Sequence, residues 1–187
     1  MDFIKTVMLA VYRLPFWKLG FLLLSCTTLF FFINRKLQKK KWIRYALLIV
    51  AALYVGIIVC VTVFWREEPA QGQSFDLRPF ISYVRYANGQ IEMLRECIMN
   101  VVFFYPLGLL FGTAAGGAKR KRKYALIFGA GVLLSAGIEF CQWKFHLGFA
   151  ETDDVIHNAL GIGLGLLAAA KGGSILGKWL PLRIGRG

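Results

Sequence analysis

Acidic residues are scarce in this chain. Its 187 residues include ten Asp and Glu against 23 Lys and Arg, which gives a formal net charge of +13. Cysteine and histidine are also rare, with four and two copies, and no Cys-x-x-Cys pair occurs. Together with an apolar fraction of 57%, this composition excludes a disulfide-stapled secreted domain, a collagen-like chain and a disordered chain.

Apolar and aromatic side chains are what the sequence has in excess. The mean hydropathy is +0.57, and aromatic residues make up 15% of the chain. A chain of this size has too little interior to hide so much apolar surface from water. The composition therefore predicts an integral membrane protein.

The positive charge read alone would suggest a nucleic-acid partner. Its distribution argues against that interpretation, because the basic residues are clustered next to apolar stretches. Basic residues in such places set membrane topology and contact anionic lipid headgroups. We therefore expect membrane lipids, and no nucleic acid, as partners.

Five apolar stretches qualify as membrane spans. A hydrocarbon core of ~30 Å requires about 20 helical residues, so the first and last stretches are short. The first can extend backwards over 9–14, with Pro15 as a kink. The pattern predicts an all-α, polytopic membrane helical bundle with about five transmembrane helices. The five stretches are 16–33, 43–65, 97–116, 124–143 and 155–170.

Charge alternates between the ends of these spans. The basic segments 34–44, 119–123 and 171–187 fall on one side of the membrane. The acidic segments 66–96 and 144–154 fall on the other. Because Lys and Arg accumulate in cytoplasmic loops, the N-terminus is predicted outside and the C-terminus inside. The predicted parts are a first span with its basic loop (1–44), a transmembrane domain (45–170) and a basic cytoplasmic tail (171–187).

Small residues are concentrated in the last three spans. Lipid gives helices no hydrophobic reason to associate, so close backbone approach at small residues holds them together. We therefore expect a tight core of spans three to five, with spans one and two more peripheral. The glycines concerned are Gly108, Gly112, Gly116, Gly129, Gly131, Gly137, Gly161, Gly163 and Gly165.

Polar side chains mark the predicted outer ends of the same spans. Glu139 lies inside an apolar span, where a carboxylate is costly unless it is paired or protonated. Asn100, Gln142, Asp154 and Asn158 lie at comparable depths. We expect these residues to converge into one polar cup that faces the outer leaflet.

Each of these residues also has a simpler interpretation. Asp153 or Asp154 can cap the fifth helix and complement its dipole. Asn100 can satisfy backbone groups at a helix start, and Gln142 can be solvated at the interface. The spacing of the polar residues matches no zinc signature, so no metal or cofactor is predicted.

Two cysteines raise a separate question. Cys97 and Cys141 lie near the outer ends of neighbouring spans, so they are compatible either with a disulfide or with two free thiols.

The segment 66–96 contains an Asn88-Gly89 turn signal, and 91–99 is predicted to form an amphipathic helix that leads into span three. Arg78 in this segment is a cation available to a phosphate or to Glu139. The alternative is an interfacial loop with no direct role.

Four short motifs follow one another in a recognisable order. Each resembles a segment of the VanZ-like membrane proteins, and the resemblance covers about 45–170. An arginine common in that family before the Asp-Asp pair is missing, and 143–152 offers only Lys144 and His146. The motifs are Asp76-Leu-Arg-Pro79-Phe80 (with Asp where Asn is usual), Asn100-x-x-x-Phe104-x-Pro106-x-Gly108, Glu139-x-x-Gln142 and Asp153-Asp154-x-x-x-Asn158-x-x-Gly161.

This resemblance implies a multi-pass protein of the bacterial cell membrane. The family's namesake accompanies glycopeptide-resistance genes and gives low-level resistance to teicoplanin, a lipidated glycopeptide. The leading hypothesis is a cell-envelope protein that lowers teicoplanin sensitivity by binding a lipopeptide or a lipid-linked wall precursor. The predicted binding residues are Arg78, Asn100, Glu139, Gln142, Asp154 and Asn158.

Other functions are compatible with the same residues. A membrane hydrolase or transferase would use Glu139 and Asp154 as acid and base on a lipid-linked envelope substrate. A transporter is a further alternative, for which an oligomer would supply more spans. In a purely structural protein, the polar residues would only hold the helices together.

Overall fold

The computed structural model describes residues 41–64, 75–115, 120–147 and 150–179, together with the isolated positions 25, 27, 28 and 30. The predicted first span therefore lies almost entirely outside the described residues. The four continuous ranges all belong to one compact unit, Lys41–Gly187.

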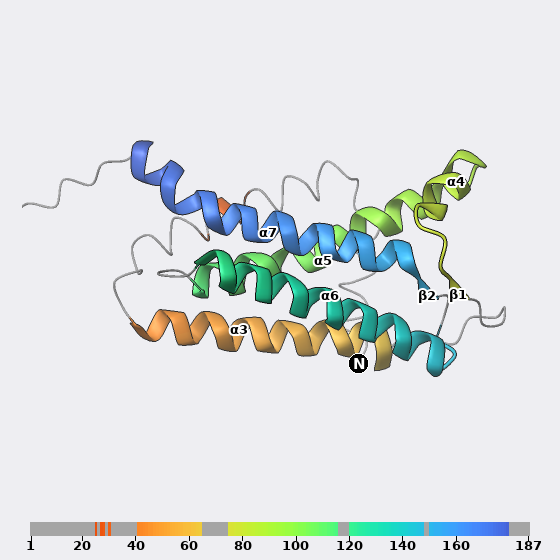
Figure 1. Ribbon diagram of the computed structural model, residues 1–187, viewed down its shortest axis with the longest axis horizontal. Helices are drawn as coiled ribbons and strands as arrows, with labels where there is room; N and C mark the ends of the chain where they lie inside the picture. The colour runs from red at the N-terminus through yellow and green to blue at the C-terminus, as the bar shows by residue number, and fades with distance from the viewer. Residues whose placement is uncertain are drawn as a thin grey trace, which may run out of the picture. The chain divides into compact units, whose positions relative to one another are not determined.

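Four long helices build the described part of this unit (Figure 1). They correspond to the predicted spans two to five. A five-residue π-helix, η1 (Cys60–Phe64), continues the first of them. The four helices are α3 (Lys41–Val59), α5 (Ile91–Ala114), α6 (Arg120–Lys144) and α7 (Thr152–Trp179).

Three helices of the described residues are long and apolar enough to cross a membrane: Trp42–Phe64, Ile91–Ala114 and Lys121–Lys144. Large apolar side chains such as Leu53 and Leu133 are exposed on the outside of the helices, as expected where lipid replaces water. The predicted helical fold with membrane-spanning candidates is thus confirmed for the described residues. Helix α7 covers the predicted fifth span but is not among the three, so the span count and the orientation stay predictions.

Helices α5 and α7 make the closest contact of the bundle. A Cβ atom on Gly108, Gly161 or Gly165 would overlap backbone atoms of the facing helix. At Gly112, a Cβ would lie 2.9 Å from the Cβ of Ala169. Small residues at four-residue spacing therefore create this seam, as predicted.

Helix α6 fits the prediction of a glycine-packed core only in part. A Cβ on Gly131 would overlap Cδ1 of Ile162 on α7, so this glycine does pack against the neighbouring helix. Among the described residues, a Cβ on Gly129 or Gly137 would meet nothing within 4 Å, so these glycines do not pack helices together. Helix α3 is less peripheral than predicted, because Ile58 and the adjoining Val63 of η1 belong to the buried core. The Tyr54 hydroxyl also donates to the Phe103 carbonyl of α5 at 3.0 Å.

Two very short strands connect loops that are far apart in the sequence. Strand β1 (Phe75–Asp76) pairs in parallel with β2 (Ala150–Glu151), so that Asp76 lies opposite Glu151. Helix α4 (Ile81–Ala87) follows β1 and ends at the Asn88-Gly89 turn, where Gly89 has a φ of 94°. Helix α5 begins at Ile91, which confirms the predicted turn and the lead-in helix.

Candidate functional site

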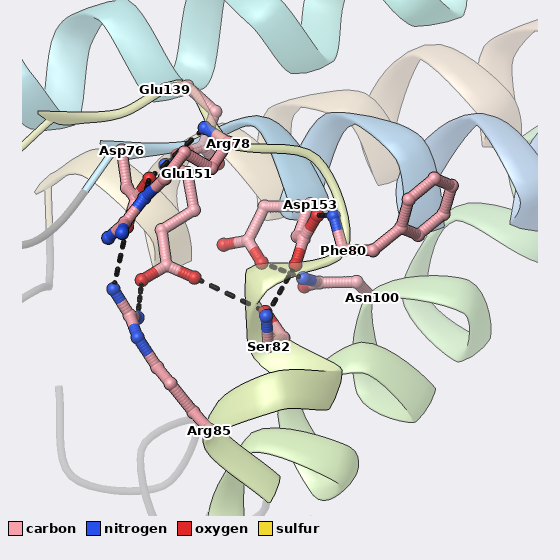
Figure 2. Close-up of polar contacts among 10 residues, drawn as sticks. Asp76, Arg78, Phe80, Ser82, Arg85, Asn100, Glu139, Glu151 and Asp153 are labelled. Atoms are coloured by element: carbon pink, nitrogen blue, oxygen red, sulfur yellow. Dashed lines mark hydrogen bonds and ion pairs between the residues drawn. The ribbon is translucent and has the colours of Figure 1, made fainter. Parts of the chain in front are cut away.

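A polar network gathers at the end of the bundle that carries α4, β1, β2 and the start of α7 (Figures 1 and 2). We call this the strand end. The basic residues Lys121 and Arg122 lie at the opposite end of α6. The network consists of Asp76, Arg78, Ser82, Arg85, Glu151 and Asp153.

Asp153 is the centre of this network and is fully buried. Its carboxylate accepts the backbone N–H of Ser82 at 2.7 Å and also that of Phe80. Phe80 adopts a left-handed conformation, with a φ of 65°, at the start of α4. The first N–H groups of a helix lack intrahelical partners, so Asp153 supplies the missing acceptor for α4. The carboxylate thus bonds α4, whereas the sequence had suggested a cap for the fifth helix.

Two arginines join the acidic side chains of the paired strands. Arg78 binds Asp76 in a bidentate manner, with Nε–Oδ1 at 2.9 Å and Nη2–Oδ2 at 2.8 Å. Arg85 donates Nη2 to Asp76 Oδ2 at 2.9 Å and Nη1 to Glu151. Arg85 therefore bridges the carboxylates of β1 and β2. The hydrogen bonds from Arg78 hold the pKa of Asp76 well below its usual range, and Asp76 in turn raises the pKa of Arg78.

Two of the predicted site residues meet between α5 and α7. The Asn100 side chain donates Nδ2 to Asp154 Oδ1 at 2.7 Å. The contact joins the motif that opens α5 to the Asp-Asp motif that opens α7. Because Asp154 directly follows Asp153, this contact adjoins the network described above.

Glu139 connects α6 to the strand end. Its Oε2 accepts the backbone N–H of Glu151 at 3.2 Å, and only 6% of the residue is exposed. Glu139 and Glu151 also line a groove with a volume of about 410 Å³, which we call the α6 groove. The lining residues are Leu77, Ala136, Glu139, Phe140, Trp143, Glu151, Thr152 and Val155.

The remaining predicted residues lie in separate contacts. Asn158 donates Nδ2 to the Ser135 hydroxyl at 2.9 Å, between α7 and α6. Gln142 donates Nε2 to the Thr62 carbonyl of η1 at 3.1 Å. The buried oxygens Asn158 Oδ1 and Gln142 Oε1 have no partner among the described residues. The structure thus distributes the predicted site over several contacts, and Arg78, expected to face a phosphate or Glu139, binds Asp76.

A tyrosine and a histidine extend the network. His157 Nδ1 lies 2.5 Å from the Asp153 carbonyl, and Nε2 lies 2.7 Å from the Tyr83 hydroxyl. Because a carbonyl oxygen only accepts, Nδ1 carries the hydrogen of the bond to Asp153, and Nε2 is hydrogen-bonded to the Tyr83 hydroxyl. Burial, followed by the charges of Cys97 and Asp153, raises the pKa of the Tyr83 phenol.

Ser82, Tyr83 and Arg85 were not predicted from the sequence. A usable signal was the spacing of Ser82 and Arg85, which puts both on one face of a short helix after Pro79.

The cysteine question is settled for the described residues. Cys97 and Cys141 are free, so the disulfide alternative is wrong.

The comparison with known families agrees with this geometry. The family model described as VanZ/LLP1 matches residues 51–175. The chain belongs to the VanZ/LLP1 family. No curated protein and no solved structure matches it.

In this VanZ-like chain, three of the motifs that carry the resemblance contact one another. Asp153 holds the backbone of Phe80 in the first motif. Asn100 binds Asp154. Three of the four motifs are therefore joined at the strand end, whereas Glu139 of the remaining motif binds the backbone of Glu151, which lies just before the Asp-Asp motif.

Proposed function

We propose that this VanZ-like protein lowers the sensitivity of a bacterial cell to teicoplanin by binding an amphiphilic ligand at the strand end. The ligand is a lipopeptide or a lipid-linked wall precursor. The observation that carries the proposal is the α6 groove, which places an apolar wall directly beside buried carboxylates. Sites for amphiphiles combine these two features, and a volume of about 410 Å³ is within the usual range of ligand pockets.

The proposed location is the outer leaflet of the bacterial cell membrane. Lys121 and Arg122 lie at one end of α6, and Glu139 lies 18 residues beyond Lys121. At the rise of an α-helix, this separation is roughly 27 Å, comparable to the hydrocarbon core. The positive-inside rule then supports an outward-facing strand end, with Lys121 and Arg122 against anionic headgroups of the inner leaflet.

The polar residues have distinct roles in this proposal. Glu139 contacts the ligand, because it lines the groove. Asn100 and Asp154 fix the start of α7, which forms one wall. Gln142 and Asn158 each hold α6 to a neighbouring helix. Arg78 is largely exposed and directly follows Leu77, which lines the groove, so it would meet a polar headgroup.

Antibiotic susceptibility in a Gram-positive host tests this proposal. Empty vector, wild type, Glu139→Gln and Asp154→Asn are compared for teicoplanin and vancomycin at matched membrane levels. We expect wild type to protect selectively against teicoplanin and both variants to lose protection. Absence of protection by well-expressed wild type would remove the resistance role.

A structure-guided pair of variants locates the effect in the groove. Ala136→Phe fills the α6 groove, whereas Leu133→Phe adds the same ring on the same helix outside it. We expect loss of protection for Ala136→Phe and full protection for Leu133→Phe. Equal behaviour of the two variants would place the function elsewhere.

A second candidate is hydrolysis or group transfer on a lipid-linked substrate. Glu139 reaches the groove, and Asp154 is held in a fixed position by Asn100. These two carboxylates would act as acid and base. Lipid profiles of cells that carry wild type or Glu139→Gln test this candidate, since a catalytic role requires that the product disappear in the variant.

A further inference from the structure

The walls of the α6 groove combine aromatic rings with carboxylates. Phe140 and Trp143 lie on one wall with their ring centroids 5.9 Å apart. Glu139 and Glu151 are the charged residues beside them, and both are less than a tenth exposed. Among the lining residues, all within the described part of the chain, none is basic.

The surroundings keep this groove negative. The network and the two acidic residues that adjoin it, Glu139 and Asp154, have five carboxyl groups and two arginines. The carboxyl groups belong to Asp76, Glu139, Glu151, Asp153 and Asp154, and the arginines are Arg78 and Arg85. Arg78 forms an ion pair with Asp76, and the guanidinium of Arg85 forms ion pairs with both Asp76 and Glu151. An anionic group placed in the groove would therefore be repelled by carboxylates that sit in a poorly solvated site.

A protonated amine fits both features of the groove. Its N–H groups donate to carboxylates in charge-assisted hydrogen bonds. Its positive charge is also attracted to the faces of aromatic rings, most strongly to tryptophan. The apolar residues Leu77, Ala136 and Val155 complete the wall for an alkyl chain attached to that amine.

We propose that the α6 groove binds an amphiphile that carries a protonated amine beside an alkyl or acyl chain, and that it rejects amphiphiles whose headgroup is a phosphate. The inference rests on the proposed function, because it concerns the same site. It narrows that function, since it favours an amine-bearing lipopeptide over a phosphate-bearing lipid-linked precursor as the ligand.

Photolabelling of the full chain in neutral maltoside micelles tests this directly. The probe is dodecylamine with a diazirine in its alkyl chain, and labelled residues are mapped by mass spectrometry. We expect labels on 136–143 of α6 and on Val155. We expect unlabelled dodecylamine to displace the probe at about tenfold lower concentration than dodecanol, and dodecyl phosphate to be weaker than dodecanol.

Variants separate the contribution of charge from that of shape. Ala136→Phe should abolish labelling, whereas the control Leu133→Phe should retain it. In the double variant Glu139→Gln/Glu151→Gln, dodecylamine should lose its advantage over dodecanol. A neutral diazirine dodecanol probe should still label this variant, which shows that the groove is intact.

Three results would overturn the inference: equal displacement by all three competitors, strongest displacement by dodecyl phosphate, or labels confined to other helices. The measurement is independent of antibiotic susceptibility. Amine-selective labelling without teicoplanin protection would refute only the resistance role. Protection without amine selectivity would refute only the ligand class.

Discussion

The Asp153 carboxylate accepts the Ser82 backbone N–H at 2.7 Å, although the two residues are 71 positions apart. The same carboxylate accepts the N–H of Phe80. A residue in the first turn of α7 thus serves as the N-terminal cap of α4. This one contact couples a short helix outside the predicted spans to a long helix of the bundle.

Asp153→Ala should destabilise the protein by about 1–3 kcal/mol, because it leaves the buried Ser82 N–H and the partly buried Phe80 N–H without this acceptor. Thermal unfolding in detergent measures the loss. The matched control is Glu92→Ala, which removes an exposed carboxylate that lies 3.9 Å from Arg95. Since exposed ion pairs contribute little, the control should unfold close to wild type. Equal effects of the two substitutions would contradict the capping role.

Gly165→Ala should loosen the contact between α5 and α7. Its new Cβ would overlap the Tyr105 carbonyl and lie 2.6 Å from the Leu109 nitrogen, both of them backbone atoms that cannot turn aside. Overpacking of this kind costs about 1–3 kcal/mol.

Gly137→Ala is the control for this prediction. It makes the same change on α6, where a Cβ would meet nothing within 4 Å among the described residues. We expect it to be neutral or slightly stabilising in thermal unfolding, because alanine is the better helix former. If Gly165→Ala unfolded at the same temperature as wild type, the two helices could move apart at this position without a loss of stability, which would contradict the prediction.

The pKa of Asp76, lowered by hydrogen bonds from Arg78, predicts a pH dependence of stability. A carboxyl whose pKa is lower in the folded state stabilises the fold above its unfolded pKa of about 3.9. This contribution is lost as the pH falls from there through the lower, folded value. Stability should therefore be insensitive to this group near neutral pH and should fall in acid.

Asp76→Asn checks the origin of that slope. The variant cannot ionise at position 76, so its unfolding temperature should depend less on pH below about 4 than that of wild type. It should also unfold earlier at pH 7, because Arg78 and Arg85 lose a charged partner. If the unfolding temperature of Asp76→Asn fell with acid as steeply as that of wild type, other carboxyl groups would be responsible for the loss of stability.

Asn100→Asp should disrupt the start of α7. It replaces an amide that donates to Asp154 at 2.7 Å with a second carboxylate, and like charges at this distance repel. We expect a lower unfolding temperature at pH 7 than for the uncharged substitution Asn100→Leu, which only removes the hydrogen bond. The reverse order would mean that the packing of residue 100, and not its charge, matters at this position.

The sequence was sufficient to predict the helices and the seam between α5 and α7. Long apolar runs can satisfy their backbone in lipid only as helices, and glycine at Gly108, Gly161 and Gly165 permits close approach. The same rule failed for Gly129 and Gly137, because periodicity does not say which glycines face a neighbouring helix. It also could not predict that η1 would bring Val63 into the core.

The polar site was predictable only in part. Asn100 and Asp154 were expected near one another, and the structure joins them. The cap by Asp153 was not predictable, because its partners are backbone groups of a distant loop. Arg78 was assigned to a phosphate or to Glu139, yet Asp76 lies two residues away and binds it first. Local pairing of this kind is hard to recognise before the loop conformation is known.

The glycine seam of α5 and α7 has a further consequence when it is considered together with the strand end. Small residues repeat every fourth position on both helices, at Gly108 and Gly112 of α5 and at Gly161, Gly165 and Ala169 of α7. Such a repeat offers similar packing after a slide of one helical turn, about 5.4 Å. Helix packing alone would leave the axial position of α7 ambiguous. Two sets of contacts at the start of α7 remove that ambiguity, because a slide of one turn would break both: the bond between Asn100 and Asp154, and the two bonds that Asp153 accepts from Phe80 and Ser82. The short helix α4 therefore helps to fix the position of α7 along its own axis, relative to α5.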